Sequence, residues 1–143
     1  MSFNFKYLPD VALADVAFEV EADTWQDLLA GAAVATTGVM VDLSTVMPSR
    51  TRHVDLVADS LESLVYDWLS ELVYLKDTEG LFGRDFSFDG GEAHGWQVTA
   101  HIVGETIDRK RHLLGQDVKA VTLHLFEAGI QNGRYHARVV LDI

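Results

Sequence analysis

The sequence predicts an α+β domain with two layers, in which two main helices pack on one face of a mostly antiparallel sheet. Two segments repeat apolar residues with the helical period. Several other segments alternate polar and apolar residues, which is typical of strands. Turn sequences rich in Gly and Asn separate these strands. With 143 residues, of which 48% are hydrophobic, the chain has the size and composition of a single domain over residues 1–143.

The first strand–helix pair is predicted near the amino terminus. Val16, Phe18 and Val20 face one way, and they alternate with the acidic face that begins at Asp15. The helix that follows begins at Trp25. Its predicted apolar face consists of Leu28, Leu29, Ala32, Ala33, Thr36, Val39 and Met40.

A second helix has a cleaner period and opens in the same way. Its face consists of Leu61, Leu64, Val65, Trp68, Leu69, Leu72 and Val73. We expect Asp23 and Asp59 to cap the two helices, because short acceptor side chains satisfy free N–H groups in a first turn. Ala22-Asp23-Thr24 and Ala58-Asp59-Ser60 each follow an extended segment. The pattern predicts two similar strand–helix units, through local resemblance or an old duplication.

Three further alternating runs begin at Trp96, Val121 and Tyr135. In the middle run, Val121, Leu123 and Leu125 share one predicted face, opposite Thr122, His124 and Phe126. Hairpin turns are predicted at Asp89-Gly90-Gly91 and at Gln131-Asn132-Gly133.

The charge balance restricts the partners. There are 22 acidic and 11 basic residues, for a net charge of -11, which argues against an autonomous nucleic-acid binder and against anionic membranes. It suits a metal cation or a basic protein partner, although a high-salt habitat would produce the same balance. The absence of cysteine excludes disulfides, thiolate zinc sites and cysteine nucleophiles. No secretion signal or membrane span is visible, so we expect a cytoplasmic protein.

Known catalytic motifs are absent from the sequence. It contains no Gly-x-Ser-x-Gly elbow, no phosphate-binding loop and no His-x-x-x-His pair, and its six histidines are scattered. His124 lies in an apolar run. It is either a hydrogen-bonded, half-buried residue, which is the simpler interpretation, or part of a site.

Two acids at strand ends suggest a metal site. Asp15 begins the first alternating run, and Asp142 closes the last. If these strands are antiparallel neighbours, both carboxylates converge with the terminal carboxylate of Ile143 and nearby carbonyls. Calcium and magnesium prefer such oxygen ligands. From the pattern alone, two solvent-exposed strand-end acids are the simpler interpretation.

The only concentrated basic run is Asp108-Arg-Lys-Arg-His112. Its usual explanation is an exposed loop. Its functional interpretation is a contact with phosphates of a nucleotide or RNA, or with an acidic partner surface.

Several motifs in register resemble the archease family. Asp117-Val-Lys-Ala-Val-Thr-Leu-His124 is very close to the family's Val-Lys-Ala-Val-Thr-Tyr-His signature. The further matches are Ala14–Ala17, Met40-Val-Asp42, Asp67–Leu72, Tyr74–Gly80, Arg111-His112 and Val139–Ile143.

The resemblance implies an activator and not an enzyme. Archeases assist the GTP-dependent RNA ligase that joins 3′-phosphate or 2′,3′-cyclic-phosphate ends to 5′-hydroxyl ends in tRNA splicing and RNA repair. They promote guanylylation of the ligase and its turnover. The implied partner is that ligase, with RNA involved only indirectly. The implied cofactor is a divalent metal, with calcium expected, held by Asp15, Asp142 and Ile143. Lys119, His124, His112 and Asp42 fall at positions that we expect near the ligase or its nucleotide.

The chain departs from the family at Ala12, where a His is usual, with Asp10 nearby as a possible substitute. Ser70 replaces a common Asn, and Leu123 replaces the usual Tyr. Two other functions stay open: a calcium-binding interaction protein or general chaperone with no link to RNA, and a metal-dependent hydrolase, which would need an open site and a general base.

Overall fold

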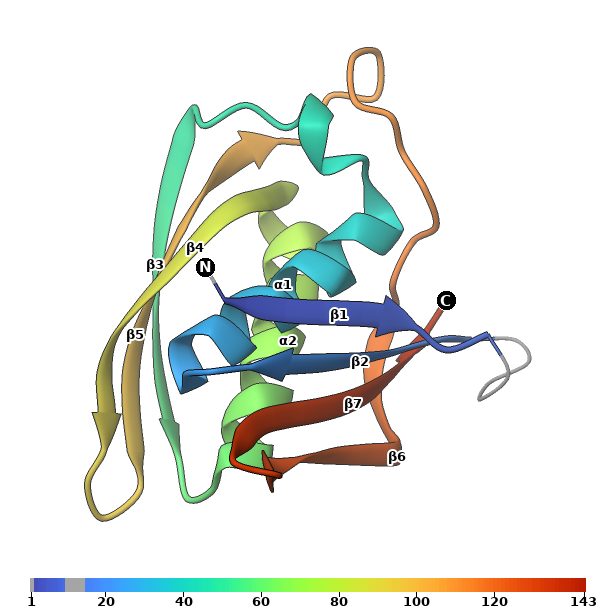
Figure 1. Ribbon diagram of the computed structural model, residues 1–143. Coiled ribbons are helices and arrows are strands. Elements are labelled where there is room, and N and C mark those ends of the chain that lie inside the picture. Colours follow the sequence, from blue (N-terminus) through green and yellow to red (C-terminus); the bar gives the residue numbers. More distant parts are fainter. Residues whose placement is uncertain (1, 10–14) are drawn as a thin grey trace.

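The computed structural model describes residues 2–9 and 15–143. Within these ranges the chain forms two α-helices, a short 3-10 helix and seven strands, so the predicted α+β class is confirmed (Figure 1). The helices are α1 (Trp25–Met40), η1 (Leu43–Thr45) and α2 (Leu61–Glu79). The strands are β1 (Phe3–Tyr7), β2 (Val16–Ala22), β3 (Arg50–Ala58), β4 (Leu81–Glu92), β5 (Trp96–Thr106), β6 (Ala120–Gln131) and β7 (Arg134–Asp142). None of the described helices is long and apolar enough to cross a membrane.

The strands divide into two antiparallel sheets. One has the order β1-β2-β7-β6 and the other β3-β5-β4. Both helices lie between the sheets (Figure 1), and each contacts strands of both. Each sheet therefore carries the helices on one face, but two sheets enclose the helices where a single sheet and two layers were expected. Strand alternation does not determine how the strands are shared between sheets.

Two strand–helix–hairpin units are nested in the chain. The inner unit runs β3-α2-β4-β5, and it interrupts an outer unit made of β2, α1, β6 and β7. In both units the strand before the helix pairs with the second strand of the hairpin, so β3 lies beside β5 and β2 beside β7. The repeated strand–helix pattern in the sequence reflects this arrangement.

Trp68 joins the helices to the three-stranded sheet. Its side chain is fully buried, and its indole N–H donates to the carbonyl oxygen of Leu29 at 2.9 Å. Its ring meets Phe86 and Phe88 edge-on, with centroids 5.9 and 5.1 Å away. Each such aromatic pair contributes about 0.5–1.5 kcal/mol beyond its buried area. This cluster fixes α2 against α1 and β4.

The helix caps lie one residue later than predicted. The hydroxyl of Thr24 accepts the N–H of Asp27, and the hydroxyl of Ser60 accepts the N–H of Ser63. Asp23 is engaged elsewhere, because it accepts the Ser2 hydroxyl and lies 3.3 Å from Arg134. These two contacts lower the pKa of Asp23.

Strand β6 does not follow the predicted alternation. Its pairing with β7 shifts between Thr122 and Glu127, and Leu125 has a positive φ of 54°. Leu123 and Leu125 are consequently 73% and 44% exposed whereas Val121 is buried, so the prediction that the three share one face was wrong. Phe126 turns inward instead and packs on the ring of Tyr66.

One of the two predicted turns is correct. Asn132 and Gly133 join β6 to β7 with φ values of 54° and 77°, as expected for a tight hairpin. The segment Asp89-Gly90-Gly91, by contrast, belongs to β4, and its hairpin turns at Ala93–Gly95. Gly90 pairs with Val98 in the ladder at φ 107°, so this glycine serves a strand irregularity and not a turn.

Candidate functional site

The strand-end acids lie at one end of the four-stranded sheet. Strand β2 pairs antiparallel with β7, and Val16 stands opposite Leu141, so the predicted neighbourhood of the two strands is confirmed. Continuing this register makes Asp15 and Asp142 the next pair. Asp15 is half-buried and Asp142 is exposed. Ile143 is half-buried and packs against the core.

Lys119 lies at the same end. Its backbone N–H donates to the carbonyl oxygen of Asp142 at 2.8 Å, and the following residue, Ala120, pairs with Asp142 in the β6–β7 ladder. The Lys119 side chain is exposed. The fold therefore brings Asp15, Asp142, Ile143 and Lys119 to one edge.

A cavity of about 450 Å³ opens beside Asp15. Burial raises the pKa of Tyr7 in its wall, and the Tyr7 hydroxyl donates to the carbonyl oxygen of Ala35 at 2.9 Å. The wall is otherwise mainly apolar, and its other members are Leu8, Pro9, Val16, Ala17, Gly38, Val39 and Gln116.

The donor chemistry at this edge suits a hard cation. Asp15 and Asp142 offer carboxylate oxygens, and main-chain oxygens such as that of Ile143 add to them. Calcium accepts six to eight oxygens from such mixed sources, including water. In residues 2–9 and 15–143 no group of three or more His, Asp or Glu side chains is positioned to hold an ion. A metal here would thus use two carboxylates and complete its shell with main-chain oxygens and water. Asp10 and Ala12 lie outside the described residues.

The segment that joins β5 to β6, residues 107–119, runs over the end of α1, and we call it the strap. The N–H groups of Gly115 and Gln116 donate to the carbonyl oxygens of Met40 and Val39, at 2.8 and 2.9 Å. These contacts satisfy carbonyls that the end of a helix leaves free. A Cβ on Gly115 would lie 2.3 Å from the Val39 oxygen, so only glycine fits there.

Lys76 ties the other end of the strap to α2. Its side chain is 8% exposed, and its ammonium contacts Asp117 at 2.5 Å and Asp77 at 2.6 Å. It also donates to the carbonyl oxygen of Val118 at 2.9 Å. Burial acts to lower the pKa of Lys76, but the hydrogen bonds and charges of Asp117 and Asp77 outweigh it and raise the pKa. The strap therefore enters β6, just before Lys119, in a fixed position.

His112 is engaged inside the protein. Its side chain is fully buried. Its Nδ1 accepts the N–H of Asp108 at 2.8 Å, which leaves Nε2 to donate to Glu105 at 2.9 Å. Glu105 also receives Arg111 and the N–H of Met47. The contact with Arg111, followed by those with Met47 and His112, lowers the pKa of Glu105 from its ordinary 4.5 to about 2.

The side chains of the two remaining sequence candidates do not contact Glu105, although the N–H of Asp42 donates to the carbonyl oxygen of Leu113 in the strap at 2.8 Å. Asp42 caps η1, where it accepts the N–H and the hydroxyl of Ser44 at 3.0 and 2.8 Å. These hydrogen bonds lower the pKa of Asp42. His124 is exposed in the irregular part of β6, so its interpretation as a half-buried residue was wrong. A role for either residue toward a partner stays a prediction.

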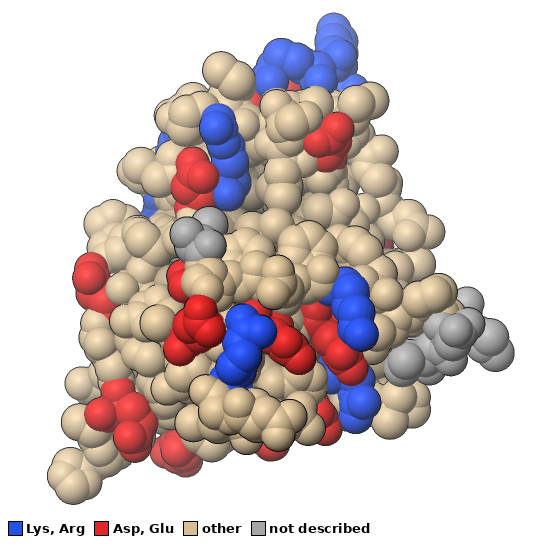
Figure 2. All heavy atoms as spheres, in the orientation of Figure 1, with Lys and Arg blue, Asp and Glu red and all other residues tan. Residues whose placement is uncertain are grey.

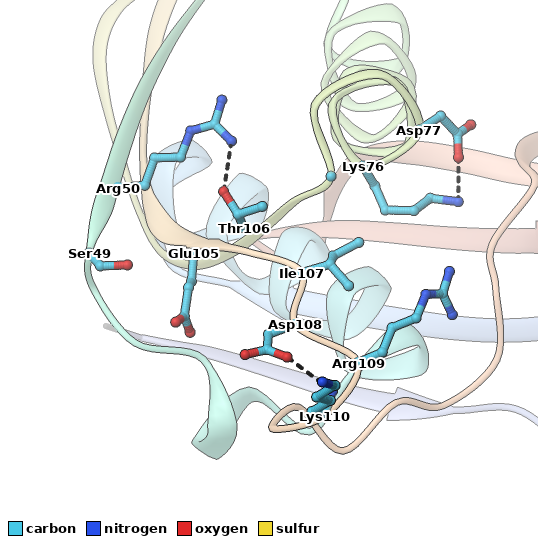
Figure 3. Close-up of a pocket in the computed structure, with 11 residues that line it drawn as sticks. Ser49, Arg50, Lys76, Asp77, Glu105, Thr106, Ile107, Asp108, Arg109 and Lys110 are labelled. Atoms are coloured by element: carbon cyan, nitrogen blue, oxygen red, sulfur yellow. Dashed lines mark hydrogen bonds and ion pairs between the residues drawn. The ribbon is translucent and has the colours of Figure 1, made fainter.

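Sequence reasoning missed a larger hollow at the carboxyl end of α2. It is lined by residues of β3, α2, β5 and the strap, and Figure 3 shows Arg50, Lys76 and Thr106 around it. One signal was present in the sequence. Lys76 follows Leu72 by four residues and Val73 by three, which places a lysine on the apolar face of the helix.

Comparisons with known proteins show the family to which the chain belongs. The model of the Archease protein family (MTH1598/TM1083) matches residues 5–143. The protein archease of Methanopyrus kandleri is 35% identical over 91% of this chain and 94% of its own length. The protein archease of Methanosarcina barkeri is 33% identical over 98% and 96%.

Two solved structures share the fold. The solution structure of Methanobacterium thermoautotrophicum protein 1598 aligns with a TM-score of 0.79 at 32% identity, over 99% of both chains. A Thermotoga maritima crystal structure, described as an archease and possible chaperone, aligns at 0.58 and 19% identity, over 95% and 96%. With the family model spanning nearly the whole sequence, and with relatives above 30% identity over most of their length, this chain belongs to the archease family.

Proposed function

We propose that this chain activates a GTP-dependent RNA ligase that joins 3′-phosphate or 2′,3′-cyclic-phosphate ends to 5′-hydroxyl ends in tRNA splicing and RNA repair. In this role it promotes transfer of GMP to the ligase and is not itself an enzyme. Membership of the archease family supports the proposal. The net charge of -11 also supports it, because a protein that handles RNA offers a basic surface to an acidic partner.

The β2–β7 register carries the proposal. It makes Asp15 and Asp142 the next pair beyond Val16 and Leu141, beside Lys119, whose N–H is bonded to Asp142. We assign to Asp15, Asp142 and Ile143 the binding of a divalent cation, with calcium as the expected ion. Bound there, the cation would supply positive charge that holds anionic groups of the ligase or its nucleotide.

The residues of this edge then act through the groups that they place against the ligase and its nucleotide. The acidic surface of the chain faces the basic partner, the two carboxylates hold the cation, and Lys119 extends its exposed ammonium toward the nucleotide phosphates. Activation requires that this surface bind the guanylylation-competent state of the ligase more tightly than the resting state. Each tenfold preference corresponds to about 1.4 kcal/mol of differential binding.

The test measures covalent ligase–GMP with the cognate ligase, labelled GTP and manganese, at substoichiometric amounts of this protein. We expect faster and more complete labelling. Asp142→Asn should abolish the effect, whereas Asp59→Asn should retain it. Asp59 is exposed and forms no side-chain hydrogen bond or ion pair in the described part of the chain. Both variants remove one negative charge, so the comparison separates the effect of the Asp142 position from that of the overall charge.

Two results would refute the proposal. Full stimulation by a folded Asp142→Asn variant would remove this edge from the mechanism. No stimulation of a ligase that is otherwise competent would leave a calcium-dependent interaction protein, with no link to RNA, as the better account.

A further inference from the structure

The hollow at the carboxyl end of α2 has a volume of about 1040 Å³ (Figure 3). It lies between the start of β3, the end of α2 and the first part of the strap. We call it the basic hollow, and it is lined by Ser49, Arg50, Lys76, Asp77, Gly80, Glu105, Thr106, Ile107, Asp108, Arg109 and Lys110.

The carboxylates of the basic hollow are all engaged. Asp77 pairs with Lys76 at 2.6 Å, and Glu105 receives Arg111 and His112. Asp108 accepts the backbone N–H of Lys110 at 3.0 Å. Their negative charge is therefore partly compensated within the protein.

Two of the four cations are free by comparison. Arg50 pairs with Glu79 at 2.5 Å, and Lys76 is saturated by its own partners. Arg109 and Lys110 are exposed, and neither forms a salt bridge with any residue of the described ranges. Figure 2 shows Lys and Arg gathered at the end of the molecule where Figure 1 places the tip of the strap.

Three carbonyl oxygens at the end of α2 are already hydrogen-bonded, so they do not offset the positive charge of these cations. The Glu79 oxygen accepts from Arg50, the Gly80 oxygen from the N–H of Ile107, and the Lys76 oxygen from the N–H of Gly80. Carbonyls that a helix end would otherwise present are thus occupied by groups of the protein.

The remaining lining indicates the class of ligand. Ser49 and Thr106 add hydroxyls to the lining, and the Thr106 hydroxyl accepts from Arg50 at 3.2 Å (Figure 3). Ile107 is the only aliphatic side chain of the lining. Protein interfaces place aromatic and aliphatic side chains at their centre, and this lining offers an acidic protein segment Ile107 alone of that kind. Phosphodiesters need cations and hydroxyl or N–H donors.

We propose that the basic hollow binds the phosphate backbone of single-stranded RNA, with Arg109 and Lys110 as the contacting cations. The inference deepens the proposed function, because RNA is the substrate of the ligase, and it replaces a purely indirect role of RNA with a direct contact. The net charge of -11 keeps that contact weak, with a dissociation constant on the order of 10⁻⁴ M at physiological salt.

Two phosphate contacts predict a definite salt dependence. For single strands, the logarithm of the binding constant falls by about 0.7 per contact for each logarithmic unit of salt. Two contacts give a slope of about -1.4, which corresponds to about sevenfold weaker binding between about 50 and 200 mM salt.

The experiment titrates the isotope-labelled full chain with oligouridine about twelve nucleotides long and follows amide shifts by NMR. We expect the largest amide shifts at and around Arg109 and Lys110. We also expect binding to weaken about sevenfold between about 50 and 200 mM salt. The double variant Arg109→Gln/Lys110→Gln should lose both. The control Lys6→Gln/Arg134→Gln removes two cations of the four-stranded sheet, the exposed Lys6 and the half-buried Arg134, and it should keep both.

Each other outcome overturns the inference. Equal losses in the two double variants would show a general field effect, and no shifts at low salt would exclude the site. Equal shifts with GTP would indicate a nucleotide site, and stronger shifts with a polyglutamate peptide would indicate an acidic protein partner.

Ligase guanylylation is measured without RNA, so it distinguishes the two proposals. Arg109→Gln/Lys110→Gln should stimulate guanylylation normally, whereas Asp142→Asn should not.

Discussion

The backbone N–H of Lys119 donates to the carbonyl oxygen of Asp142 across 2.8 Å, where β6 begins and β7 ends. This bond uses only main-chain atoms, so it survives any substitution that keeps the Lys119 amide. The exposed ammonium is free to act on a partner. The structural role of the Lys119 main chain can therefore be tested apart from the proposed role of its side chain.

Lys119→Ala should reduce stimulation of ligase guanylylation without changing the fold. We expect the free energy of unfolding to stay within about 0.5 kcal/mol of wild type, as for most exposed substitutions. Urea denaturation and the labelling assay measure the two effects. Unchanged stimulation would show that the Lys119 side chain has no role toward the nucleotide.

Calcium should stabilise the protein through Asp15 and Asp142. A ligand that binds only the folded state adds about 2.7 kcal/mol at a hundred times its dissociation constant, which raises Tm by about 5–10 °C in a chain of this size. Chelation should reverse the rise, and Asp142→Asn should abolish it. A rise of equal size in that variant would place the bound ion elsewhere.

Acid should weaken the protein through Glu105. Its pKa is lowered from 4.5 to about 2, so its contribution to stability is complete above pH 4.5 and is lost as the pH falls toward 2. Glu105→Gln should lower stability at neutral pH and reduce the pH dependence in that window. Urea denaturation at several pH values measures this. An unchanged pH profile would contradict the assignment.

Gly115→Ala should displace the strap. Its new Cβ would meet the Val39 carbonyl oxygen at 2.3 Å, and overpacking of this kind costs about 1–3 kcal/mol. Gly129→Ala is the matched control, because its Cβ would meet nothing within 4 Å; we expect a change of at most about 1 kcal/mol there. Denaturation of both variants tests the difference, and equal stabilities would mean that the strap yields easily.

Lys76→Met should loosen the entry into β6. It leaves the Val118 carbonyl oxygen without its donor, and an unsatisfied buried group costs about 1–3 kcal/mol. Relative to wild type, the variant should exchange its amide hydrogens faster at residues 117–120, with little change in the β4–β5 hairpin. Uniform exchange across both regions would show that Lys76 is not the local anchor.

The sequence was most informative where local periodicity and packing agree. The helical periods correctly predicted α1 and α2 because their apolar faces are the faces that become buried. Alternation along β2 and β7 held in part, since one face of each strand lies against the helices, but Ala17 and Val140 on the opposite faces are buried as well. The antiparallel pairing of the two strands gave the Asp15–Asp142 neighbourhood. The caps shifted by one residue because Asp23 has competing contacts with Ser2 and Arg134, which are distant in sequence.

The errors arose where tertiary contacts override a local pattern. Leu123 and Leu125 alternate as a buried strand would, but the register shift in β6 and the inward turn of Phe126 onto Tyr66 reverse their exposure. Asp89-Gly90-Gly91 has the composition of a turn, and its neighbours in β5 instead extend it as a strand. The basic run at Asp108–His112 indicated one part of the basic hollow, but the hollow combines three separate segments, so no local pattern could indicate its full lining.

The nesting of the inner unit within the outer one has a consequence for how the candidate metal edge forms. Pairing of β2 with β7 brings together residues such as Glu21 and Arg134, which are 113 positions apart, whereas β4 and β5 are joined by a short turn. Loop closure makes distant pairings late events in folding. We expect the inner unit to form first and shorten the effective distance between the chain ends. Asp15 and Asp142 would then meet last, so a folding defect in the inner unit would remove cation binding at an edge where both carboxylates belong to the outer unit.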